Sequence, residues 1–324
     1  MTAVAAKIRL GAGRALFLGV VAAAYGFLLL PLVIVVLASF NSGELLTFPP
    51  EGFSLRWYEH FFNSEPFMNS LFFSLWLAAL AMAVSTLLGT AAALYVVRFA
   101  GRWRDTIRLL IVTPLLLPEI LSAVALLFFF YSIGLGKTVT GLVIGHVLIT
   151  LPFVFLAVAS VLYNFDSSLE EAARSLGANK LATFRRVTLP LIKPGVISGA
   201  LLAFIVSFDL FAISLLLKGI GLETLPIQLF DYVTWDFDPT AAAVSTVSIA
   251  ITMLAVLLID RIRGLRQQQR NRRRGGRRGG GWDHHGDVSE SEVGRIRPGA
   301  LSFLARISPA PGFPLPLHGP PCRV

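Results

Sequence analysis

The chain has 324 residues, of which 55% are hydrophobic and 15% are charged, and its mean hydropathy is +0.72. This balance excludes an ordinary soluble domain and is typical of a protein that crosses the membrane several times. The formal charge of +9 does not argue for a nucleic-acid-binding protein, because residues 262–324 hold twelve arginines against four acidic residues and leave residues 1–261 almost neutral.

Six stretches are long and apolar enough to be transmembrane helices, which need about 20 mostly apolar residues to cross roughly 30 Å of hydrocarbon. They cover residues 15–40, 69–97, 107–133, 139–163, 195–217 and 241–259. The first is longer than the apolar core of a signal peptide, which has about 7 to 15 residues, and it shows no small-residue cleavage site. We therefore expect it to be retained as a helix.

Basic residues are dense in every second connection between these stretches. They lie before the first stretch, between the second and third, between the fourth and fifth, and after the sixth: Lys7, Arg9, Arg14, Arg98, Arg102, Arg104, Arg108, Arg174, Lys180, Arg185, Arg186, Lys193 and Arg261. Connections rich in Lys and Arg stay on the cytoplasmic side. The pattern predicts that both termini are cytoplasmic and that the segments around Glu51, Lys137 and Asp231 face the outside.

Three parts follow from this organisation. Residues 1–14 form a cytoplasmic N-terminus, residues 15–261 form a six-span domain with a cytoplasmic segment at 166–190, and residues 262–324 form a basic, low-complexity tail that we expect to be disordered. The tail could bind anionic lipid headgroups or RNA. We favour the third interpretation, that it has no function.

The cytoplasmic segment 166–190 reads as two short helices. Asp166 or Ser167 can cap the first helix, and acidic residues follow in its first turn, where the helix dipole favours them. Gly177 is expected to end or bend it. The spacing of Leu169, Ala172, Ala173 and Leu176 predicts a narrow face of small and apolar side chains that another protein can approach closely. Pro190 and Pro194 are expected to close the segment.

The spacing of residues in this segment resembles the EAA motif of permease subunits of ATP-binding cassette importers. That motif reads E-A-A, three residues, G, nine residues, I-x-L-P, and its positions here are Glu171, Ala172, Ala173, Gly177, Val187, Leu189 and Pro190. Val187 replaces the isoleucine of the motif. The resemblance implies an all-α integral membrane fold, the type I importer permease fold of about six transmembrane helices. It also implies that the segment is a coupling helix, which sits in a groove of the ATPase subunit and transmits its movement to the spans.

Within that family the body is most similar to permeases of spermidine/putrescine importers. The shared stretches are 38–41, 52–58, 118–120, 151–153, 207–209 and 225–226. The resemblance implies an inner-membrane subunit that moves a polyamine with the help of ABC ATPase subunits, a second related permease and an extracytoplasmic solute-binding protein. A homodimeric permease pair, another cargo (an amino acid, an opine or a metal complex), a channel and a membrane-embedded enzyme remain as alternatives.

Away from their ends, the apolar stretches contain three acidic or histidine residues, and such residues mark functional positions by default. Asp209 lies in the fifth stretch beside aromatic residues and could contact a cationic substrate, or make a structural contact with a neighbouring helix or subunit. Glu119 follows Pro118, which is expected to kink the third stretch near a cavity. We take both acids as translocation-pathway candidates. His146 is expected to be a hydrogen-bonded structural residue.

Motifs for catalysis are missing from the sequence. The stretch 134–138 resembles the end of a phosphate-binding loop, but the motif requires glycine where Tyr131 stands. Neither G-x-S-x-G nor H-E-x-x-H occurs, and the single cysteine, Cys322, excludes an internal disulfide or a CxxC metal site. We therefore expect no enzyme activity, no metal and no cofactor in this chain, with ATP bound by a partner ATPase.

Overall fold

The computed structural model describes residues 2–236 and 238–278, and this part of the chain is helical without a strand. The chain divides into two units, Met1–Asn271 and Arg272–Val324, and the bundle lies in the first. Its helices are α1 (Thr2–Ala38), α2 (Arg56–Asn63), α3 (Glu65–Arg98), η1 (Gly101–Trp103), α4 (Arg104–Leu116), α5 (Glu119–Ser132), α6 (Val139–Tyr163), α7 (Ser168–Ser175), α8 (Lys180–Thr183), the π-helix η2 (Phe184–Thr188), α9 (Leu189–Phe208), α10 (Phe211–Leu217), α11 (Leu225–Trp235) and α12 (Thr240–Arg278).

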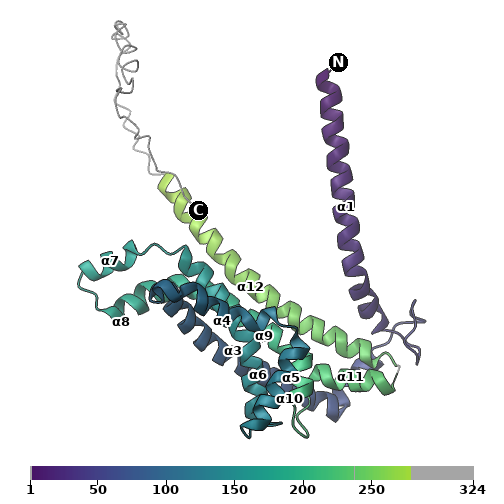
Figure 1. Cartoon of the computed structure of the whole chain (residues 1–324). Coiled ribbons are helices and arrows are strands. Elements are labelled where there is room, and N and C mark those ends of the chain that lie inside the picture. The colour runs from purple at the N-terminus through teal and green to yellow at the C-terminus, as the bar shows by residue number, and fades with distance from the viewer. Residues whose placement is uncertain (1, 237, 279–324) are drawn as a thin grey trace, which may run out of the picture. The chain divides into compact units, whose positions relative to one another are not determined.

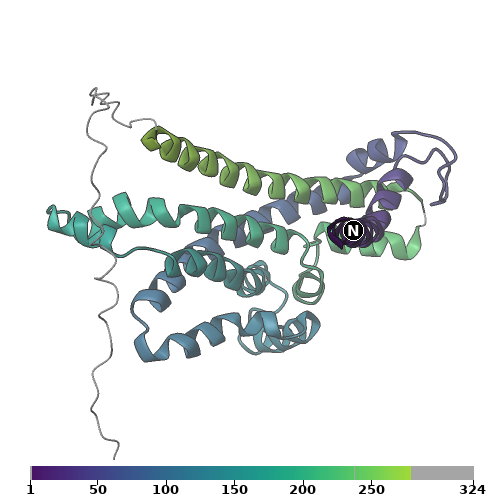
Figure 2. The ribbon, with the colours of Figure 1, turned by 90° about the horizontal axis from the view of Figure 1, so that it is seen from above.

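Helices α3, α6 and α9 pack together at the centre of the bundle (Figures 1 and 2). Glycines permit the close approach: a Cβ at Gly199 of α9 would lie 2.8 Å from Val154 Cα of α6, and one at Gly89 of α3 would lie 2.8 Å from Val154 Cβ. Small residues at helix contacts are the usual way in which membrane helices gain packing contacts without a hydrophobic driving force.

Buried polar side chains add hydrogen bonds between these helices. The Ser85 hydroxyl of α3 lies 2.7 Å from the Thr150 hydroxyl of α6. His146 of α6 is fully buried, and its two ring nitrogens lie 2.8 Å from Ser207 Oγ and 3.0 Å from Ser214 Oγ. The structural role expected for His146 is therefore confirmed, and its ring ties α6 to both α9 and α10.

Within residues 2–236 and 238–278, five helices are long and apolar enough to cross a membrane, and a bent pair raises the number to six when it is taken as one crossing. Two expected spans differ from single helices. The stretch 107–133 is broken into α4 and α5, which meet at an angle of 103°. Leu117 has φ −89° and ψ 141° there, because a residue that precedes proline is driven out of the helical region.

The stretch 195–217 is the second expected span that is wrong as a single helix. Helix α9 begins at Leu189, ends at Phe208 and is followed after Asp209 and Leu210 by the short α10. Leu210 has φ −71° and ψ 94°, which is not helical. Asp209 therefore lies at the end of a helix and not in the middle of one.

Pro190 and Pro194 do not close the segment 166–190 as expected. The chain runs on from α8 through η2 into α9, and residues Lys180–Phe208 form one continuous helical stretch. Pro190 sits in the first turn of α9, where its missing N–H is tolerated. The Leu189 N–H reaches back to Phe184 O across the wider turn of the π-helix, which keeps the stretch continuous.

Helix α12 continues through Arg278, beyond the expected end of regular structure at residue 261. Residues 262–274 are rich in Arg and Gln, which are good helix formers. The remainder of the predicted tail, residues 279–324, lies outside the described residues, and its disorder stays a prediction.

Candidate functional site

The segment 166–190 begins with a capped helix. The Ser168 N–H donates to Asp166 Oδ1 at 3.0 Å, so Asp166 and not Ser167 supplies the cap of α7. Hydrogen bonds from the Ser168 side chain and backbone lower the pKa of Asp166 and keep it charged. Asp166 and the acidic residues of the first turn therefore place negative charge at the positive end of the helix.

Gly177 makes the turn between α7 and α8. Its φ is +86°, a conformation that glycine adopts without strain, and the space around its Cβ position is open. The Ala178 N–H bonds to Ala173 O at 3.1 Å and closes the end of α7. After the turn, Asn179 Oδ1 accepts from the Ala182 N–H at 2.8 Å and caps α8.

The outer face of α7 is exposed and apolar. Leu176 is 89% exposed and Leu169 47% exposed, while Ala172 is exposed and Ala173 half-buried between them. This is the face of small and apolar side chains expected from the spacing. It lies at one end of α9, away from α10 and α11 (Figures 1 and 2).

The predicted motif is divided between two places in the structure. Glu171, Ala172, Ala173 and Gly177 lie on α7 and its turn, and Glu171 points to solvent. Val187, Leu189 and Pro190 lie at the junction of η2 with α9, at the base of the segment. The motif therefore marks both an exposed helix and the start of the span that follows it.

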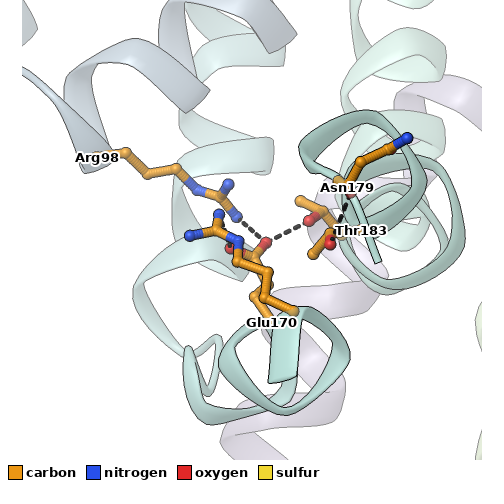
Figure 3. Close-up of polar contacts among 6 residues, drawn as sticks. Arg98, Glu170, Asn179 and Thr183 are labelled. Atoms are coloured by element: carbon orange, nitrogen blue, oxygen red, sulfur yellow. Dashed lines mark hydrogen bonds and ion pairs between the residues drawn. The ribbon is translucent and has the colours of Figure 1, made fainter. Parts of the chain in front are cut away.

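Glu170, one of the acidic residues expected in the first turn of α7, bonds to two other helices, which its residue type and position alone do not predict. Its side chain is 11% exposed, and Arg98 Nη2 of α3 donates to Oε1 at 2.6 Å. The Thr188 hydroxyl of η2 donates to the same oxygen. Figure 3 shows Arg98 and Glu170 pointing toward one another, with the bond from Thr183 to Asn179 beside them.

The charge of Glu170 is stabilised by these neighbours. Burial acts to raise the pKa of Glu170, but the hydrogen bonds from Thr188 and Arg98 and the charges of Arg98 and Arg174 outweigh it, so the pKa lies below its usual value. Arg174 Nη2 lies 3.9 Å from the other carboxylate oxygen, one helical turn away. Glu170 is thus an ionised, partly buried carboxylate with two cationic neighbours.

The two pathway candidates lie at the two helix breaks. Glu119 is the first residue of α5, and its Oε1 accepts from the Ala212 N–H of α10 at 3.0 Å, so it joins the break in one span to the break in another. Asp209 ends α9, and the side chains of both acids are exposed. Phe211, two residues after Asp209, packs against Phe230 of α11, and the centroids of their rings lie 5.3 Å apart.

Among the described residues, no three His, Cys, Asp or Glu side chains are grouped so that they could hold a metal ion.

Comparison with known proteins places these features in a family. The model of the family described as binding-protein-dependent transport system inner membrane component matches residues 85–270. The chain is 35% identical over 236 residues to the spermidine/putrescine transport system permease protein PotC of Haemophilus influenzae, covering 72% of this chain and 91% of that protein. It is 36% identical over 230 residues to the putrescine transport system permease protein PotI of Escherichia coli, covering 68% and 81%.

Solved structures share the fold at lower sequence identity. A bacterial ABC transporter involved in the import of alginate matches with a TM-score of 0.57 and 19% identity over 78% of this chain and 95% of that one. An amino acid ABC transporter matches with a TM-score of 0.50 and 18% identity over 64% and 96%. The helical arrangement is therefore that of importer permeases.

Proposed function

The chain belongs to the family of binding-protein-dependent transport system inner membrane components, and from that premise we propose that it is the permease subunit of an ABC importer for polyamines. It is a multi-pass inner-membrane protein and a transport component, not an enzyme. The polyamine assignment rests on the permeases PotC and PotI, which are similar to this chain over more than two thirds of its length. The runner-up is the same permease with an amino acid, an opine or a metal complex as cargo.

The exposed face of α7 is the single observation that carries the coupling function. Leu169 on α7 and Leu176 at its end are exposed apolar side chains, and the small side chains of Ala172 and Ala173 let a partner backbone come close. An ATPase subunit with a groove for this helix is the partner that fits. ATP is bound and hydrolysed there, and this chain needs no cofactor of its own.

The remaining partners follow from the family, whose members work in binding-protein-dependent transport systems. A loaded solute-binding protein docks outside, a second and related permease supplies the other half of the pathway, and two ATPase subunits close on the inside. Closure moves α7, and the spans then open to admit the substrate. In this arrangement both termini of the chain are cytoplasmic, since α7 and the arginine-rich connections lie on that side.

Asp209 and Glu119 are proposed to line the pathway for a cation. Both carboxylates lie at breaks in neighbouring spans. The breaks place non-helical backbone at membrane depth, which is tolerated where it borders a cavity. Exposed carboxylates and the rings of Phe211 and Phe230 suit the passage of ammonium groups. A contact with the second permease is the alternative role for either acid.

Uptake by the assembled complex tests the cargo. The chain, its second permease, the ATPase subunits and the binding protein are reconstituted in liposomes, and uptake of labelled putrescine, spermidine, amino acids, opines and metal complexes is compared. We expect ATP-dependent uptake of putrescine or spermidine and no uptake of the other solutes. Uptake of another solute class with no polyamine uptake would refute the assignment.

Co-purification tests the docking face. Leu176→Asp places a charge on the exposed apolar face of α7, so the ATPase subunits should be lost from the purified complex. Leu45→Asp makes the same change at an exposed position of the outer segment and should leave them bound. Retention of the ATPase subunits in Leu176→Asp would show that they dock elsewhere.

Topology can be tested because the chain has a single natural cysteine, Cys322. In a Cys322→Ser background, a cysteine at Glu44 should react with an impermeant thiol reagent added outside, and one at Ser175 should react only after the reagent is admitted to the cytoplasmic side. The reverse pattern would place both termini outside.

A further inference from the structure

Helix α7 packs against α8 and η2, and its described side-chain hydrogen bonds to other helices all come from one residue, Glu170. Among the side-chain hydrogen bonds described for α7, the two that reach other helices both end on Glu170 Oε1, whereas the Ser168 N–H bonds to Asp166 in the preceding connection and the Ser175 hydroxyl bonds within the helix to Glu171 O. A short non-helical connection joins the start of α7 to α6, and the turn at Gly177 joins its end to α8. Neither connection is helical, and the Glu170 bonds fix α7 relative to α3 and η2 across them.

The two donors to Glu170 belong to different spans. Arg98 is the last residue of α3, and Thr188 is the last residue of η2, which continues without interruption into α9. Charge-assisted bonds of this kind are short and directional, and here they are largely shielded from water. One carboxylate oxygen therefore joins the docking helix to the cytoplasmic ends of two central helices.

We propose that Glu170 is a positioning residue that makes α3 and α9 follow the movement of α7, so that the work done by the ATPase reaches the pathway. The proposal rests on the proposed function, in which α7 is the helix that the ATPase moves. Helix α9 then carries the movement to its end at Asp209, and α3 carries it through the same bundle core. Without Glu170, α7 rocks on its two connections and the spans stay still.

This role differs from that of the neighbouring acid. Successive residues on a helix point about 100° apart, so Glu170 faces the bundle while Glu171 faces solvent and the partner. Loss of Glu171 is expected to weaken docking. Loss of Glu170 is expected to leave docking intact and to separate ATP hydrolysis from transport.

The experiment uses the full complex in liposomes with Glu170→Ala and Glu170→Gln. The ATPase subunits should remain bound in normal amounts, and ATP hydrolysis should continue. Its stimulation by the loaded binding protein should be lost, and uptake per ATP should fall at least about fivefold. Glu59→Gln, which removes an exposed carboxylate from the outer helix α2, should change none of these quantities.

Three further variants separate positioning from folding. Thr188→Val removes one bond to the carboxylate without leaving an unpaired charge, and uptake per ATP should fall, whereas Thr188→Ser should restore it. Exchange of the pair, Arg98→Glu with Glu170→Arg, should recover part of the uptake that either single change abolishes. Normal uptake per ATP in Glu170→Ala or in Thr188→Val would overturn the proposal.

The outcomes also distinguish this proposal from the docking function on which it rests. Release of the ATPase subunits from Glu170→Gln would overturn it, because the residue would then act in docking itself. If Leu176→Asp keeps its ATPase subunits, docking by α7 fails. If Leu176→Asp loses them while Glu170→Ala transports normally, only the positioning role fails.

Discussion

Backbone conformation, and not a lack of space, favours glycine at position 177, since φ is +86° and no atom lies within 4 Å of the Cβ position. A β-branched residue is strongly disfavoured in that region, and an L-residue there costs about 1–2 kcal/mol, less for Asn. Gly177→Val should therefore reduce both ATPase co-purification and uptake, while Gly177→Asn should retain most of each.

A second glycine provides the matched control for this prediction. Gly221 has φ +74° and equally open surroundings, but it lies in the connection between α10 and α11. Gly221→Val introduces the same strain and should leave ATPase co-purification unchanged. If both valine variants lose the ATPase, the turn at Gly177 has no special part in docking.

Glu119 permits a second test at the scale of one residue, because its two possible roles need different atoms. Glu119→Gln keeps an oxygen that can accept from the Ala212 N–H but removes the charge, whereas Glu119→Ala removes both. If the carboxylate attracts a cation, Glu119→Gln should lower polyamine uptake about tenfold without changing the thermal stability of the complex. Normal uptake in Glu119→Gln with loss in Glu119→Ala would show that the residue only joins α5 to α10.

Single residues differ in how far the sequence could predict them. The turn at Gly177 and the bonded state of His146 follow from residue type and local context. The role of Glu170 does not, because the choice between two adjacent acids depends on the rotation of α7 relative to Arg98, 72 residues earlier in the chain. The functional roles of the motif residues and of Asp209 and Glu119 stay predictions.

At the scale of helices, contact between α6 and α9 depends on the absence of side chains. A methyl group at Gly199 would approach Val154 Cα to 2.8 Å, and backbone cannot yield as a flexible side chain can. Gly199→Ala should therefore push α9 from α6 and lower stability by about 1–3 kcal/mol.

The midpoint of thermal aggregation of the detergent-solubilised protein measures this effect. Gly19→Ala in α1 adds the same group where nothing lies within 4 Å, so its midpoint should match that of the unmodified protein. Equal midpoints for Gly199→Ala and Gly19→Ala would mean that α9 moves freely relative to α6.

Hydropathy predicts the positions of the apolar helices well but does not indicate where two of the predicted spans break. The stretch 139–163 coincides with α6, because its ends are marked by polar residues. The break after Asp209 has apolar residues on both sides, so a sliding average passes across it. Pro118 did give a local signal, and the expected kink is present as a bend of 103°.

At the scale of the whole molecule, two independent boundaries fall at nearly the same place. The match to the transport family ends at residue 270, and the first compact unit ends at Asn271. A chain truncated after Asn271 should therefore insert, assemble and transport polyamine as the full chain does, measured by uptake in the same liposomes. A large fall in uptake would assign a function to the arginine-rich tail.

The bent pair α4–α5 has a consequence for how the protein enters the membrane during synthesis. Its halves have 13 and 14 residues, so each is about 20 Å long and shorter than the roughly 30 Å of hydrocarbon. Neither half is long enough to be a finished span by itself, and non-helical backbone at membrane depth is tolerated only where protein or a cavity borders it. Most of their packing contacts with other spans are with α6 and α10, which are synthesised later. We therefore expect this region to stay with the insertion machinery until the chain has been made past Leu217, so that the third crossing is completed after the fourth.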